Sequence, residues 1–133
     1  MPFEDKYLDV LQNLEFAIQN VYKAHKNLND YDVHSAIESL IEFYTAEERN
    51  REPRNFNLSE NSIEVYEEVK KMCDFRLGRS KLEDDLQGDL PHPISINEIL
   101  ICLKRIKNSI TKWTKRSGRQ GYLDFVKQYI SNV

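Results

Sequence analysis

The chain of 133 residues is 40% apolar and 31% charged, contains only four glycines and four prolines, and carries a net charge of −3. This length fits one domain over residues 1–133, and the composition favours a helical chain over a disordered or β-rich one. No apolar run reaches the roughly 18–20 residues of a membrane-spanning helix, and the N-terminus lacks a secretory signal, so we expect a soluble cytoplasmic protein without a membrane partner.

Apolar residues recur every three or four positions from residue 3 to about residue 28, which predicts a first amphipathic helix. The polar stretch that follows interrupts the pattern, and Asp30 or Asp32 is suited there to cap the next helix. A second helix is predicted over residues 33–51. Pro53 ends it, because proline disfavours the helical conformation in the residue before it.

A third helix is predicted from Ser59, a favourable N-cap residue, to Gly78, a residue type common just past helix C-termini. Its apolar stripe is expected to bury Ile63, Val69 and Cys73 against the other helices. The turn residues and the apolar period thus agree on the same element.

Residues 79–95 form the longest segment without a regular period, and four of them are acidic. Ser95 and Glu98 then show the spacing of a capping box, which predicts a fourth helix over residues 96–116. Glycines at 118 and 121 turn the chain into a short fifth helix from residue 122 to about residue 130. Since no strand-like alternation occurs, we predict an all-α fold: an antiparallel four-helix bundle with a short fifth C-terminal helix.

The sequence shows no recognisable catalytic or metal-binding arrangement. Cys73 and Cys102 lie in separate apolar contexts without the spacing of a zinc site, so we expect two free thiols. No glycine-rich phosphate loop or serine-nucleophile motif occurs, and we therefore predict no cofactor, no metal and no catalytic residue. A metal-dependent enzyme using His25, His34 and the glutamates of the third helix stays a remote alternative.

The small net charge conceals a strong asymmetry along the chain. Residues 1–52 contain 11 acidic and 5 basic residues, and residues 53–98 contain 10 acidic and 6 basic ones. Residues 99–133, in contrast, contain 8 basic residues and 1 acidic residue. An acidic body is thus joined to a basic C-terminal quarter, which favours interaction with a partner of opposite charge.

Seven basic residues and no acidic one occur between positions 104 and 119, on the fourth predicted helix and the turn after it. Steps of three or four residues there predict one solvent-facing row that consists of Lys104, Asn108, Lys112 and Lys115. The start of the fifth helix offers backbone N–H groups and a dipole that attract anions. The same cations also suit the end of the fourth helix, where the dipole favours positive charge. The anion-binding candidates are Lys112, Lys115, Arg116, Gly118, Arg119 and Gly121.

Further arginines gather beside aromatic residues at the link between the second and third helices, a combination favoured in protein interfaces. The interface candidates are Lys104, Arg105, Arg49, Arg51 and Arg54. We expect a protein-interaction or regulatory module that uses its charge-asymmetric surface to bind a protein partner or a second copy of itself. The alternative is nucleic acid or a phosphate ligand on the fourth helix and the Gly118–Gly121 turn, which the pI of 5.6 disfavours.

Overall fold

A computed structural model describes residues 5–79, 92–117 and 121–131 of the chain. These residues form five α-helices and no strand, which confirms the predicted all-α fold with its short fifth helix. The helices are α1 (Asp5–Ala24), α2 (Asp30–Glu48), α3 (Glu60–Arg76), α4 (Ile96–Ser117) and α5 (Gly121–Ser131). None of the helices among the described residues combines the length and the apolar character needed to cross a bilayer.

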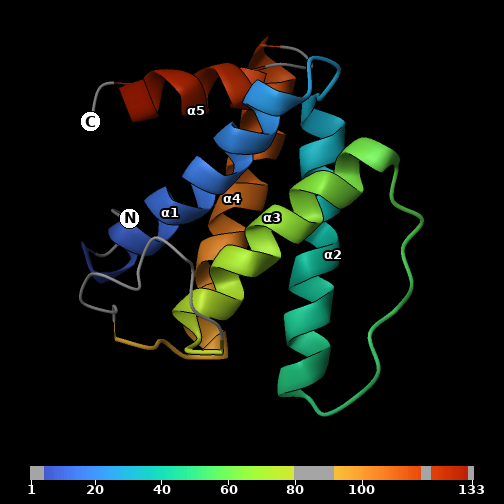
Figure 1. The fold of residues 1–133 in the computed structure, drawn as a ribbon, viewed down its shortest axis with the longest axis vertical. Coiled ribbons are helices and arrows are strands. Elements are labelled where there is room, and N and C mark those ends of the chain that lie inside the picture. The colour runs from blue at the N-terminus through green and yellow to red at the C-terminus, as the bar shows by residue number, and fades with distance from the viewer. Residues whose placement is uncertain (1–4, 80–91, 118–120, 132–133) are drawn as a thin grey trace.

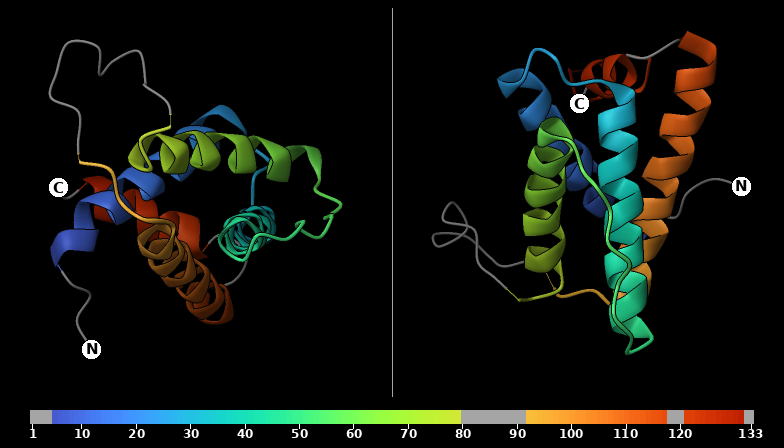
Figure 2. Two further views of the ribbon diagram at one scale, coloured as in Figure 1. Left: turned by 90° about the horizontal axis from the view of Figure 1, so that it is seen from below. Right: turned by 90° about the vertical axis from the view of Figure 1, so that its right-hand side faces the viewer.

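Helices α1 and α2 each pack against both α3 and α4, so that α3 and α4 lie diagonally across the bundle from each other. Seen from below, α3 and α4 occupy opposite sides of the molecule (Figure 2). Helix α5 crosses one end of the bundle and contacts α1, α2 and α4 (Figure 1). The outward faces of α3 and α4 therefore point away from each other.

The predicted apolar stripes of α1, α2 and α4 converge on one core. Their periodicity places an apolar side chain inward once per turn, and burial of these side chains is the main stabilising contribution of each helix. The side chains with no exposed surface include Val10, Leu14, Ile18, Val33, Ile37, Leu40, Tyr44, Ile99, Leu103 and Ile106.

Helix α2 begins and ends earlier than predicted. Asn29 is its N-cap: the side chain of Asn29 accepts the N–H of Asp32 at 3.1 Å, and its own N–H donates to the Asp32 carboxylate at 3.2 Å. Helix α1 ends at Ala24, before the predicted residue 28. At the other end Asn50 has a φ of +53°, and the Arg51 N–H reaches back to the Ala46 carbonyl at 2.9 Å. The left-handed backbone of Asn50 therefore ends α2 several residues before Pro53.

Helix α3 has the predicted caps. The side chain of Ser59 accepts the N–H of Ser62 at 3.1 Å, and Gly78 follows the helix with a φ of +79°. The N–H of Arg79 donates to the Asp74 carbonyl at 2.9 Å, which completes the glycine-terminated helix end.

The predicted buried stripe of α3 is wrong at Ile63, whose exposure is 43%. Val65 has no exposed surface and takes an inward position, together with the correctly predicted Val69 and Cys73. The reason is tertiary: α3 contacts both α1 and α2, and the side of α3 that fits between them leaves Ile63 on the outside.

Candidate functional site

Helix α4 turns its apolar side inward and leaves a basic side exposed to solvent. The exposed positions are three or four residues apart, so they share one side of the helix. We refer to this surface as the basic face. It consists of Asn97, Ile101, Lys104, Arg105, Asn108, Thr111, Lys112 and Lys115.

Three lysines of the basic face carry positive charge that no ion pair in the rest of the described structure neutralises. No ion pair within residues 5–79, 92–117 and 121–131 involves Lys104, Lys112 or Lys115. Lys107 differs from them, because it is half-buried and its Nζ lies 3.6 Å from the carboxylate of Glu38 on α2. The predicted solvent-facing row of lysines is therefore observed, and its cations are available to a partner.

The start of α5 is already occupied by a carboxylate of the chain itself. Asp30 has no exposed surface, and its Oδ2 accepts the Tyr122 N–H and the Thr114 hydroxyl, each at 3.0 Å. Its Oδ1 accepts the Leu123 N–H at 3.4 Å. The prediction that Asp30 caps its own helix α2 is therefore wrong. Asp30 instead supplies the acceptor group at the start of α5, which begins at Gly121. An external phosphate there would have to displace a buried acid.

The structure does not describe three of the anion-binding candidates in full. Gly118 and Arg119 lie outside the described residues, as does the side chain of Arg116. Lys112 and Lys115 are exposed on the basic face, whereas Gly121 is buried. The two lysines are therefore the members of this group that the structure brings together on one surface.

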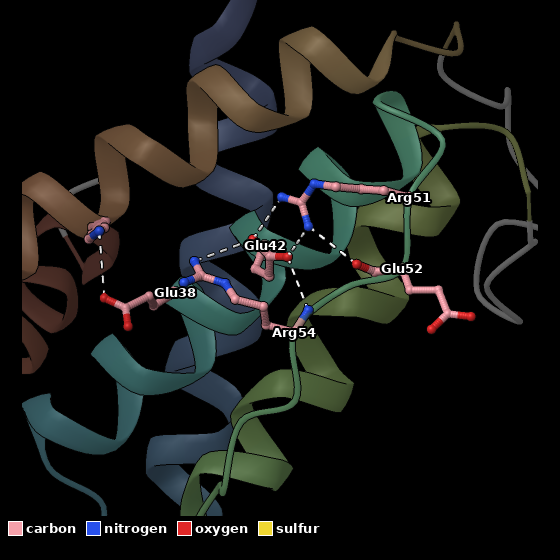
Figure 3. A network of polar contacts seen from close by, with 6 residues as sticks. Glu38, Glu42, Arg51, Glu52 and Arg54 are labelled. Carbon is pink, nitrogen blue, oxygen red and sulfur yellow. Dashed lines mark hydrogen bonds and ion pairs between the residues drawn. The ribbon is translucent and has the colours of Figure 1, made fainter.

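Two of the arginine interface candidates bind a carboxylate of α2. Arg51 binds the carboxylate of Glu42 with both terminal nitrogens, at 2.6 and 3.1 Å (Figure 3). The N–H of Arg54 donates to the same carboxylate at 3.1 Å, and its guanidinium lies 3.5 Å away. The hydrogen bond from Arg51 is the main reason why the pKa of Glu42 falls to about 2. These contacts hold residues 49–59 against α2, while Arg49 is exposed.

A pocket of about 220 Å³ lies between α2 and α4 at the C-terminal end of the basic face. Its lining includes Ile110, which is 1% exposed, and the neighbouring Thr111. His34 contributes from α2, and the exposed Lys115 contributes from α4. Asp30, Tyr31 and Thr114 complete the lining. The pocket therefore combines an apolar wall and a cationic edge with the buried carboxyl group of Asp30.

The outward side of α3 has the opposite charge and an exposed apolar residue. Its exposed positions, referred to as the acidic face, are Glu60, Ile63, Glu64, Glu67 and Lys71. Glu64 lies 3.7 Å from the imidazole of His25, which is half-buried directly after α1. Sequence periodicity missed the exposure of Ile63, although the surrounding glutamates were a signal of a solvent-facing side.

The structure also contains a buried acid that sequence reasoning missed. Glu15 on α1 is 4% exposed, and burial raises its pKa to about 7 although the charge of Arg105 lowers it. Nearby in sequence, the Oε1 of Gln19 is buried without a hydrogen-bond partner among the described residues. The sequence feature that could have indicated this buried acid is the position of Glu15 directly after the core residue Leu14.

The described residues contain no group of three or more His, Cys, Asp or Glu side chains that could hold a metal ion. Cys73 and Cys102 are buried free thiols, and burial raises the pKa of Cys102 to about 12. Such thiols are largely protonated near neutral pH and make poor nucleophiles. A scan against models of known protein families finds no match, and searches of curated proteins and of solved structures find none either.

Proposed function

We propose that the protein is an interaction module that binds an acidic protein surface through the basic face of α4. The observation that carries the proposal is the row formed by Lys104, Lys112 and Lys115, exposed on one helix side without ion pairs among the described residues. A one-sign surface of this kind raises the association rate of an oppositely charged partner and selects against others.

Apolar groups on the same surface favour a protein over a polyphosphate. Ile101 is 41% exposed near one end of the basic face, and the pocket beside Thr111 and Lys115 lies at the other. Protein interfaces combine such apolar anchors with a charged rim. Nucleic acid would gain only the charge contacts.

A direct test uses a fluorescently labelled synthetic peptide that is rich in glutamate and carries regularly spaced leucines. Reversal of three charges in Lys104/Lys112/Lys115→Glu should weaken its binding at least about tenfold, because every contact becomes repulsive. Fluorescence anisotropy measures the affinity, and added salt should weaken the wild-type complex.

The matched control is Lys23/Lys26/Lys127→Glu, which makes the same charge change at exposed positions of other segments. This variant should retain binding within about twofold. Equal losses in both variants would contradict the proposal, because binding would then depend only on net charge. Tighter binding of a labelled DNA duplex, lost in the first variant alone, would assign the basic face to nucleic acid instead.

A further inference from the structure

Ile63 is a large apolar side chain in an unusual setting on the acidic face. It is 43% exposed on α3, with Glu60 one turn before it, and Glu64 and Glu67 within the following turn. All three glutamates are exposed. An apolar side chain surrounded by carboxylates is the kind of group that a pocket with a cationic edge accepts.

The pocket between α2 and α4 has a suitable size and wall. Its volume is about 220 Å³, and an apolar cavity of about 150 Å³ is large enough for a benzene ring. It therefore accommodates an aliphatic side chain. Lys112 and Lys115 lie within about one helical turn of Thr111 in its lining. Glu64 and Glu67 on α3 are three residues apart, the same spacing as Lys112 and Lys115 on α4.

The two faces cannot meet within one molecule. Helices α1 and α2 separate α3 from α4, and the acidic and basic faces lie on opposite sides of the bundle (Figure 2). A contact between them therefore joins two copies of the chain. Because it uses a different surface of each copy, it is head-to-tail and leaves one face free at each end, so that more copies can add.

We infer that the acidic face of one copy docks on the basic face of the next, with Ile63 in the pocket between α2 and α4. This inference rests on the proposed function of the basic face and names a second copy of the chain as its occupant. The carboxylate of Glu67 is placed to meet Lys112 or Lys115 of the receiving copy, and the aliphatic side chain leaves water on docking.

The contact has a limited extent, since the 17 residues of α3 span only about 25 Å. Burial along a single helix is below the roughly 1,200 Å² of stable interfaces, so association should depend on protein concentration. It should also depend on salt, since the Debye length falls to about 3 Å at about 1 M.

The test uses two variants that each remove one face without reversing its charge. Lys112/Lys115→Gln neutralises the basic face, and Ile63→Ser/Glu67→Gln removes the apolar anchor and one charge of the acidic face. All four positions are exposed, so both variants should fold like the wild type, which circular dichroism checks.

Sedimentation velocity should show that the average mass of the wild type rises with concentration and falls with salt. Each variant alone should remain a monomer. An equimolar mixture should form dimers and nothing larger, because each variant keeps one of the two complementary faces. Leu8→Ser, which alters a 39%-exposed apolar residue on α1, should associate like the wild type.

A wild type that stays monomeric at every concentration and salt level would overturn the inference. So would an association that both variants retain, or a mixture that grows beyond dimers. If the wild type stays monomeric but still binds the glutamate-rich peptide through its lysines, the self-docking fails while the proposed function stands. If the peptide also fails to bind, both fail.

Discussion

Asp30 on α2 places its buried carboxyl group against the first backbone N–H groups of α5. Its place before an apolar stripe favours a helix cap, yet its buried carboxylate serves the N–H groups of Tyr122 and Leu123 at the start of α5. A helix start attracts anions whether they come from a ligand or from the chain. The turn that the sequence marks as an anion site therefore has an anion from within the molecule.

Replacement of Asp30 tests this role. Asp30→Ala leaves two amide N–H groups and the Thr114 hydroxyl without their acceptor, and we expect a loss of about 3 kcal/mol in the free energy of unfolding. Asp30→Asn should lose less, because it keeps one acceptor oxygen. Urea unfolding measures both. Asp124→Ala, at an exposed position of α5, is the control. An equal loss in that variant would refute the role of Asp30.

Glu15 gives the protein a pH dependence opposite in sign to that of a salt-bridged acid. Its folded-state pKa of about 7 lies above the ordinary glutamate pKa of 4.5, so the folded state keeps a proton that the unfolded state has released between these pH values. Stability contributed by the protonated form is therefore lost as pH rises from 4.5 to 7.

Glu15→Gln removes this titration. When the pH is raised from 4.5 to 8, we expect the free energy of unfolding of the variant to increase by about 2 to 3 kcal/mol relative to that of the wild type. Urea unfolding at both pH values measures the difference. Glu67→Gln, at an exposed position, should show no such gain. An advantage of Glu15→Gln that is equal at both pH values would show that ionisation of the buried acid is not its cause.

At the scale of the elements, helix caps and the apolar periodicity of each helix were predictable where they depend on residues close together in the sequence. The Ser59 and Gly78 caps of α3 are confirmed, because both act within one helical turn. The inward side of α3 was not predictable in full: Ile63 and Val65 both fit an apolar stripe, and packing between α1 and α2 decides between them.

Gly78 follows the end of α3 and lies close to Pro93, which precedes α4. An added Cβ would lie 3.2 Å from Pro93 and would occupy a left-handed conformation, so Gly78→Ala should cost about 1 to 2 kcal/mol. Thermal and urea unfolding measure this loss. Asn50→Gly, at the corresponding position after α2, is the control and should change stability by less than about 1 kcal/mol. A neutral Gly78→Ala would show that this junction adjusts freely.

At the scale of the molecule, charge is segregated between two opposite sides. The basic face belongs to α4 and the acidic face to α3, while α1 and α2 lie between them. The charge blocks along the chain were visible in the sequence, but their placement on opposite surfaces was not. This placement makes head-to-tail docking geometrically accessible and prevents the two faces from neutralising each other within one copy.

The sequence by itself determined the five helices, the core stripes of α1, α2 and α4, and the outward row of lysines, because helical periodicity is a local property. Only the tertiary structure decided that Asp30 supports α5, that Arg51 and Arg54 meet at Glu42, and that Ile63 faces outward. Each of these depends on groups that are far apart in the chain or on neighbouring helices. Their meeting is set by how the helices pack, which no local pattern encodes.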